Sequence, residues 1–283
     1  MIRRAFIKAV LFAVACAATA PIPAGAAELW QTLPPTPAPV ATGRHAEVNG
    51  IRLYYVDTGS GSPVLLLHGG LSNSDYLADV ARALKDKHRV ILVDSRGHGR
   101  STRDGRPFGY DLMADDVVAL LDALKIDKAA VVGWSDGAII GLDLAMRHPA
   151  RVTRVFAFGA NTLTSGVKDD VEQNPTFAAF VTRASGDYTR LSPTPGEYDA
   201  FHKQIGKMWE SEPNWTDGQL ATIKVPVWIV DGEHDEAIKR EHTETMAKTI
   251  PDARLLILPN TSHFAFLQDP AAFNKSVTEF LGD

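Results

Sequence analysis

The chain is poor in cysteine: Cys16 is the only one among 283 residues. An intrachain disulfide is therefore excluded, and the fold must rest on a hydrophobic core, which a chain of this length can bury. Basic residues are not in excess either, because 29 Lys and Arg stand against 34 Asp and Glu, for a net charge of −5. This balance, with no basic stripe in the sequence, argues against a nucleic-acid partner. No internal repeat is evident, and the 45% hydrophobic content is typical of a soluble globular protein.

Residues 1–26 differ in composition from the rest of the chain. Arg3, Arg4 and Lys8 precede an alanine-rich apolar run, and Ala24-Gly25-Ala26 offers a small-residue cleavage site. This layout predicts a secretory signal peptide, and the apolar run is too short for a stable membrane span. The string R-R-A-F-I-K also resembles the twin-arginine export signal, although Ile2 stands where that signal usually has Ser or Thr. Both export routes stay open, as does a disordered or membrane-anchored N-terminus.

Removal of residues 1–26 would change the net charge from −5 to −8 and would remove Cys16. The mature protein would then have no disulfide and no thiol nucleophile, and we expect it in the periplasm or outside the cell. A lipid anchor on Cys16 is the alternative. Residues 27–45 follow as a proline-rich linker, because the segment LPPTPAPVATG (33–43) has four prolines and nothing to bury.

From Ala46 onward the sequence alternates between short apolar runs and helical patterns. An Asn49-Gly50 pair between alternating apolar residues predicts a hairpin. Continuous apolar runs predict strands buried on both faces, and the runs are VLLLHGG (64–70), RVILVD (89–94), AAVVGW (129–134), VTRVFAFG (152–159), VPVWIV (225–230) and ARLLILP (253–259). Residues 111–125 and 138–149 have helical spacing of apolar residues. The alternation predicts an α/β fold with a largely parallel sheet.

The stretch GWSDG (133–137) lies where a buried strand ends and a helix begins. Glycines on both sides of Ser135 allow an abrupt turn in which neighbouring backbone passes close by. Such a strand-turn-helix with the G-x-S-x-G pattern is the nucleophile elbow, which leaves the serine hydroxyl exposed at the apex. We therefore predict that Ser135 is a catalytic nucleophile.

A serine nucleophile needs a base, usually a histidine that a carboxylate orients. In α/β sheets such groups follow the carboxyl ends of strands. Asp235 and His263 follow two later apolar runs, in the chain order Ser, Asp, His that this elbow requires. Asp231 and Glu233 remain alternative acids.

The reaction also needs donors for the developing oxyanion. One predicted donor is the backbone N–H of Asp136, which follows the nucleophile. The other comes from the His68-Gly69-Gly70-Leu71 loop, where we favour the N–H of Gly70 over that of Leu71. The Asp136 side chain itself is unusual so close to an oxyanion. Either it serves only the N-terminus of the helix, or it faces the pocket and pairs with a cation such as the ammonium group of an amino-acid ester.

The stretches LLLHGG, DSRGHGRS (94–101), GWSDG, GEHD and SHF together resemble the α/β-hydrolase fold superfamily, in its single-domain serine-hydrolase branch. The GWSDG elbow is similar to that of valacyclovir-hydrolase-like small-ester hydrolases. The resemblance implies a mostly parallel eight-stranded sheet with flanking helices and a small helical cap. It also implies that DSRGHGRS is structural. Dehalogenases and epoxide hydrolases of this fold carry Asp at the nucleophile position, so Ser135 disfavours both activities.

The resemblance assigns residues 46–160 and 223–283 to the hydrolase core and 161–222 to the cap. We expect two or three cap helices whose aromatic side chains partly line or cover the pocket and partly hold the cap down. These are Phe177, Phe180, Tyr188, Tyr198, Phe201, Trp209 and Trp215.

These observations predict an exported serine hydrolase that acts on small to medium carboxylic esters through an acyl-enzyme. No metal or organic cofactor is required, and the only predicted partner is the small-molecule ester; the oligomeric state stays open. Amides, lactones and the carbon–carbon bonds of diketones are alternative substrates. Cofactor-free perhydrolysis would use the same triad, and a slow-turnover ligand receptor would keep both fold and triad.

Overall fold

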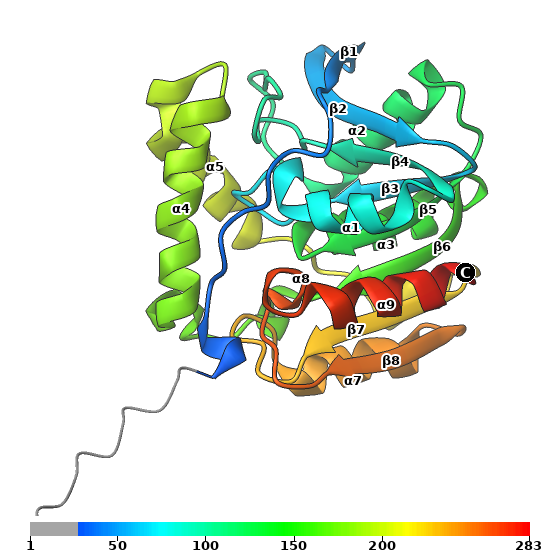
Figure 1. Cartoon of the computed structure of the whole chain (residues 1–283). Helices are drawn as coiled ribbons and strands as arrows, with labels where there is room; N and C mark the ends of the chain where they lie inside the picture. Colours follow the sequence, from blue (N-terminus) through cyan, green and yellow to red (C-terminus); the bar gives the residue numbers. More distant parts are fainter. Residues whose placement is uncertain (1–27) are drawn as a thin grey trace, which may run out of the picture.

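The computed structural model describes residues 28–283 (Figure 1). The predicted signal peptide, its cleavage site and Cys16 lie outside the described residues. Within 28–283, no helix is both long and apolar enough to cross a membrane.

A single sheet of eight strands forms the centre of the molecule, in the order β1-β2-β4-β3-β5-β6-β7-β8. The first strand pairs are antiparallel and all pairs from β3–β4 onward are parallel. The mostly parallel α/β sheet is therefore confirmed. Its strands are β1 (Arg44–Val48), β2 (Ile51–Gly59), β3 (Ser62–Leu67), β4 (His88–Val93), β5 (Ala129–Trp134), β6 (Val152–Phe158), β7 (Val227–Gly232) and β8 (Ala253–Leu258).

The predicted hairpin joins β1 to β2, with Val48 opposite Ile51. Asn49 and Gly50 both have positive φ, 43° and 77°, which the tight two-residue turn requires. The turn of the hairpin therefore lies at the predicted residues, Asn49 and Gly50.

Helices cover both faces of the sheet (Figure 1). Helices α1 (Ala78–Leu84) and α9 (Pro270–Leu281) contact each other on the face that is in front in Figure 1. Helices α2 (Tyr110–Ala123) and α3 (Asp136–Arg147) pack together on the other face, where α7 (Arg240–Thr249) also lies. The short helix α8 (Ala265–Gln268) precedes α9.

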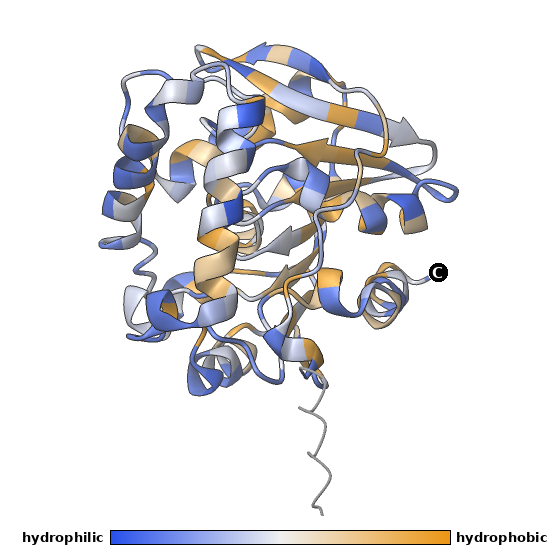
Figure 2. Cartoon of the chain, turned by 60° about the vertical axis from the view of Figure 1, so that its left-hand side comes forward, coloured by the Kyte–Doolittle hydropathy of each residue, from blue (hydrophilic) through white to orange (hydrophobic). Residues whose placement is uncertain are grey.

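The core lies between these layers because the central strands are apolar on both faces. Every residue of β5 is buried, and β3, β4 and β6 end in four buried residues each. Figure 2 shows the hydrophobic colour concentrated on the strands and the hydrophilic colour on the outer helices. Burial of this continuous apolar surface is the main favourable term for the fold.

Residues 161–222 lie beyond the carboxyl ends of the strands and contain α4 (Pro175–Leu191), α5 (Tyr198–Trp209) and α6 (Asp217–Leu220). Their aromatic side chains divide as expected between two roles. Phe177 and Trp209 line the cavity described below, whereas Phe180, Tyr188 and Phe201 are fully buried in the hydrophobic core.

The proline-rich segment 33–43 is extended, but it is not free of contacts. Leu33 and Val40 pack against the core, and the segment runs alongside α4 before it enters β1 (Figure 1). This packing could not be predicted, because prolines, threonine and alanine form no apolar pattern.

Candidate active site

Ser135 occupies the sharp turn between β5 and α3. Its backbone has φ 53° and ψ −121°, a strained conformation for a residue with a Cβ. The two flanking glycines are needed for space: a Cβ on Gly133 would lie 2.3 Å from the Gly137 carbonyl oxygen, and one on Gly137 would lie 2.1 Å from the Leu67 carbonyl oxygen. The predicted strand-turn-helix is therefore present, and a larger residue at either glycine would force β3, β5 and α3 apart.

Asp235 and His263 come together although 28 residues separate them in the chain. The Nδ1 atom of His263 lies 2.6 Å from Oδ2 of Asp235, and both side chains are buried. The other carboxylate oxygen of Asp235 accepts from the N–H groups of Ala237 and Ile238, which fixes its orientation. Gly159, at the end of β6, leaves room for the histidine ring, because a Cβ there would lie 2.7 Å from its Cε1 atom.

The charges of this pair support each other. Burial alone would lower the pKa of His263, but the charge and hydrogen bond of Asp235 outweigh it and raise that pKa above its ordinary value. For Asp235, burial works to raise the pKa, and the charge and hydrogen bond of His263 overcome it, so its pKa lies below the ordinary value. The arrangement favours an ionised carboxylate that holds the imidazole in one orientation.

Neither alternative acid is hydrogen-bonded to the His263 ring, which pairs with Asp235. Asp231 accepts from the Thr243 hydroxyl at 2.8 Å, and Glu233 accepts from the backbone N–H of Asn260. Burial, followed by the neighbouring Asp235 charge, raises the pKa of Asp231 well above its ordinary value. Sequence reasoning missed Glu236, which is buried and accepts from the backbone N–H of His263 at 3.0 Å.

The two segments that carry the predicted oxyanion donors approach each other closely. Asp136 is the first residue of α3, so its N–H has no partner within the helix. Within residues 28–283, neither this N–H nor that of Gly70 has a hydrogen-bond acceptor. The N–H of Leu71 also lacks one, so this criterion does not separate Leu71 from Gly70. A Cβ on Gly70 would lie 2.7 Å from Oδ2 of Asp136, which shows how closely the two loops approach.

The Asp136 side chain is buried and faces the cavity. It accepts a hydrogen bond from the hydroxyl of Tyr110 at 2.8 Å and from Nε1 of Trp209 at 3.1 Å. Burial raises its pKa to about 6, against the hydrogen bonds from Tyr110 and Trp209, which lower it. Asp136 therefore lies both at the N-terminus of α3 and in the wall of the cavity, and its pairing with a cationic substrate stays a prediction.

Tyr110 and Trp209 are the residues at this site that the sequence did not place. Tyr110 begins α2, and its backbone N–H is held by Glu212 at 3.0 Å. Trp209 ends the cap helix α5, and its ring packs over Gly70. Trp209 was expected only as one of several cap aromatics, and no sequence signal pointed to Tyr110.

Ser135, Asp136 and His263 open into one cavity of about 420 Å³ between the core and the cap. Its wall includes apolar side chains such as Val167, Phe177 and Ile238, and it carries five carboxylates against one lysine. The lysine, Lys168, donates to the carbonyl oxygen of Asp235. The carboxylates are Asp136, Asp169, Glu172, Glu210 and Glu212.

The DSRGHGRS loop contributes hydrogen bonds to the scaffold. Both Asp94 oxygens accept backbone N–H groups, from Ser74 at 2.7 Å and from Arg100 at 2.8 Å, and Ser101 donates to the Asp94 carbonyl. His98 is buried against Phe201. Within the part of the chain that is described, no three His, Cys, Asp or Glu side chains are grouped as metal ligands.

Known proteins resemble this chain over most of its length. A family model described as alpha/beta hydrolase fold matches residues 62–197. Serine hydrolase BPHL of Homo sapiens is 29% identical over 265 residues, covering 85% of this chain and 86% of the relative. The 2-hydroxymuconate semialdehyde hydrolase of Pseudomonas sp. strain CF600 is 29% identical over 271 residues, covering 85% and 94%.

A solved structure extends the similarity to three dimensions. Est816, described as an N-acyl homoserine lactone degrading enzyme, superposes with a TM-score of 0.68 at 28% identity, covering 83% of this chain and all but 1% of its own. The strand order, the turn at Ser135 and these similarities lead to one conclusion. The chain belongs to the α/β-hydrolase fold superfamily and is an enzyme of the serine-hydrolase kind.

Proposed function

We propose that the protein is an exported serine hydrolase that cleaves small to medium carboxylic esters through an acyl-enzyme. The observation that carries this proposal is the pair formed by Asp235 and His263, 2.6 Å apart, because His263 lines the same cavity as Ser135 at the elbow. Acyl transfer requires a nucleophile, a base and an orienting acid, and these three side chains support that assignment.

In the proposed reaction, His263 takes the hydroxyl proton of Ser135 as the oxygen attacks the ester carbonyl carbon. Asp235 keeps the imidazole oriented and stabilises the imidazolium. The backbone N–H groups of Gly70 and Asp136 hold the oxyanion, and loss of one such donor typically costs roughly 10²–10³ in rate. His263 then gives the proton to the leaving alcohol, and water, activated by the same histidine, releases the acid from Ser135.

The size of the cavity supports an ester substrate of limited size. About 420 Å³ is within the range of small-molecule sites, and the apolar wall near Phe177 suits an acyl or alcohol chain. The similarity to a lactone-degrading enzyme supports ester chemistry, because a lactone is a cyclic ester. The similarity to 2-hydroxymuconate semialdehyde hydrolase supports the alternative, hydrolysis of a carbon–carbon bond next to a carbonyl.

A fluorophosphonate probe and a series of p-nitrophenyl esters of graded chain length test the proposal together. We expect the probe to label the parent but not Ser135→Ala, and turnover to be fast for short and medium chains. Labelling with negligible turnover of every ester and a ligand-induced thermal shift would instead indicate a receptor. A vinylogous diketone in the same assay would reveal carbon–carbon hydrolysis.

Export rests on residues 1–26 and has its own test. The full-length chain is expressed in a Gram-negative host, and the periplasmic fraction is analysed by intact mass. We expect a mature protein that begins at Ala27. Protein that stays in the cytoplasm with residues 1–26 attached would contradict export.

A further inference from the structure

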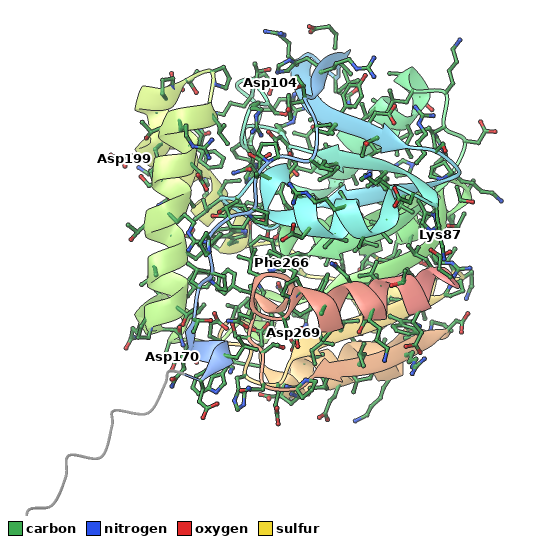
Figure 3. All side chains as sticks on the ribbon, in the orientation of Figure 1. Lys87, Asp104, Asp170, Asp199, Phe266 and Asp269 are labelled. Carbon is green, nitrogen blue, oxygen red and sulfur yellow. The ribbon has the colours of Figure 1, made fainter. Side chains whose placement is uncertain are left out.

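The N-terminal segment 28–39, here called the strap, is fastened to the molecule by side chains of three separate elements. Seven of its backbone carbonyls accept hydrogen bonds from side chains outside the strap. Figure 1 shows the strap running between the cap helix α4 and the core, and Figure 3 draws its side chains in the same orientation. The short helix α8 contacts the first turn of the strap, Leu29–Gln31. Two of the three fastening points lie next to the active site.

The first fastening point is the loop that carries His263. The buried side chain of Gln268 accepts from the backbone N–H of Ser262 at 2.7 Å. Its amide nitrogen donates to the strap carbonyls of Trp30 at 3.2 Å and Thr32 at 2.8 Å. Because Ser262 directly precedes His263, one amide group ties the strap to the backbone of the predicted base.

The strap also touches the loop that carries Asp235. The ring of Trp30 stacks on that of His234, with centroids 4.7 Å apart and planes inclined by 22°. His234 directly precedes Asp235, so the strap contacts both loops that bring the Asp235–His263 pair together.

The second fastening point is the cap. Arg183 of α4 donates to the carbonyls of Pro34 at 2.6 Å and Leu33 at 2.8 Å, and Thr176 donates to the carbonyl of Gln31. The same helix carries Phe177, which lines the cavity. The strap thereby bridges the cap and the two catalytic loops. The third point, Arg82 of α1, binds the carbonyls of Ala38 and Pro39 farther along the chain.

The prolines explain why this segment suits such a role. Proline fixes φ and has no N–H, so residues 34–39 offer carbonyl acceptors on a stiff, extended backbone whose only N–H donors are those of Thr36 and Ala38. A stiff segment loses little conformational entropy when it binds, and Gln268 and Arg183 would be left with unpaired donors without it.

We propose that the strap is a positioning element for catalysis, which holds the His263 loop through Trp30 and Gln268 and holds the cap through Arg183. The proposal rests on the proposed function, because it assigns His263 as the base. It predicts that the exported enzyme needs residues from Trp30 onward for full activity, although they contribute no group to the reaction.

The test compares Trp30→Ala, Gln268→Met and Arg183→Met with the parent, in the full chain, on one p-nitrophenyl ester. The amount of active enzyme is first titrated with the fluorophosphonate, so that kcat is expressed per active site. We expect kcat to fall about tenfold in Trp30→Ala and Gln268→Met, because small displacements of a catalytic group are costly. We expect KM to rise severalfold in Arg183→Met, because the cap helix that lines the cavity loses its tie.

Arg82→Met is the matched control. It also removes a side chain that binds strap carbonyls, but Arg82 holds the strap at Ala38 and Pro39, away from the active site. It should leave kcat and KM within twofold of the parent. Gln268→Glu adds a second comparison: it keeps the acceptor for the Ser262 N–H but cannot donate to Trp30 or Thr32, and it should be as impaired as Gln268→Met.

Three results would overturn the proposal: a kcat per active site within twofold of the parent in Trp30→Ala, parent-like kinetics in Gln268→Glu, or an equal loss in Arg82→Met. Trp30 is only half-buried, so Trp30→Ala decides the matter even if Gln268→Met fails to fold. A parent that neither reacts with the probe nor turns over esters would contradict the proposed function instead, which keeps the two failures distinct.

Discussion

Replacement of Asp136 by asparagine isolates the charge beside the nucleophile. The substitution keeps the size of the side chain and one oxygen that can accept from Tyr110 or Trp209. With a pKa of about 6, Asp136 is mostly ionised at pH 7.5 and mostly neutral at pH 5. We expect Asp136→Asn to lower kcat/KM selectively for esters with a cationic group in the acyl part.

The size of the effect follows from Coulomb's law. Two unit charges 4–5 Å apart interact by roughly 3–4 kcal/mol at an effective dielectric constant of about 20. Desolvation of the cation and of the buried carboxylate offsets part of this. A net pairing of about 1.4 kcal/mol would already correspond to a tenfold loss in kcat/KM. The remaining carboxylates of the cavity wall stay in place, so their contribution does not change between parent and variant.

The assay uses the p-nitrophenyl esters of betaine and of 3,3-dimethylbutyric acid, which have the same shape and differ in one permanent positive charge. The measured quantity is the ratio of kcat/KM for the two esters, because protonation of His263 affects both equally and cancels. With a pKa of about 6 for Asp136 and a tenfold effect of its charge, this ratio should fall about fivefold in the parent from pH 7.5 to pH 5, and in Asp136→Asn it should be low at both pH values.

An equal change of kcat/KM on both esters would refute the reasoning. In that case Asp136 would serve only the N-terminus of α3, where a negative charge contributes roughly 0.3–1 kcal/mol. A ratio in the parent that does not depend on pH would lead to the same conclusion.

Three further predictions concern the triad, the pH profile and stability. Ser135→Ala and His263→Ala should each abolish ester turnover with the fold intact by circular dichroism, and the double variant should lose little more, because triad members act as a unit; near-parent turnover in Ser135→Ala would contradict the elbow assignment. The kcat/KM profile should rise on the acid side with a midpoint above about 6.5, since Asp235 raises the pKa of His263; a flat profile between pH 5 and 9 would exclude a histidine base. Asp143→Asn should stabilise the protein by about 1–4 kcal/mol at pH 8 and less at pH 5. The buried Asp143 carboxyl has no hydrogen-bond partner, and burial raises its pKa to about 7 although the Arg147 guanidinium 3.8 Å away works to lower it. The cost of ionising Asp143 in the folded state therefore grows as the pH rises from its unfolded pKa of about 4 to about 7, and it is constant above that. Equal unfolding temperatures of variant and parent at pH 8 would rule this out.

The sheet and the elbow could be predicted because their causes are local. The apolar run of β5 is continuous, so it had to be buried on both faces. The Asn49-Gly50 pair supplies the positive φ values that a tight hairpin needs. At the elbow, only glycine fits at positions 133 and 137, so the sequence itself records the close approach of the backbone. In each case the residue types at these positions are enough to predict the local structure.

The contacts of the cap and the strap could not be predicted in this way, because no local sequence pattern indicates them. Trp209 reaches Asp136 across 73 residues, and Gln268 reaches Thr32 across 236. A tryptophan near the end of a helix, or a glutamine before a proline-capped helix, is compatible with many partners. Backbone carbonyls of a proline-rich segment are also invisible as ligands in a residue pattern, which is why the strap was expected only as a spacer.

The position of Asp136 poses an electrostatic problem that the structure helps to resolve. A carboxylate beside the oxyanion should raise the barrier, yet the same carboxylate lowers the energy of a positive charge on His263, whose pKa it helps to raise. During the proposed attack the oxyanion and the imidazolium form together, so the two effects of Asp136 have opposite signs. Hydrogen bonds from Tyr110 and Trp209 further spread its charge. For a neutral ester the two effects largely cancel, whereas a cationic ester adds the net attraction that is left after desolvation. It follows that Asp136→Asn should change the rate on neutral esters little, and that the selectivity ratio, rather than the rate on any one ester, is the quantity that reveals what this residue does.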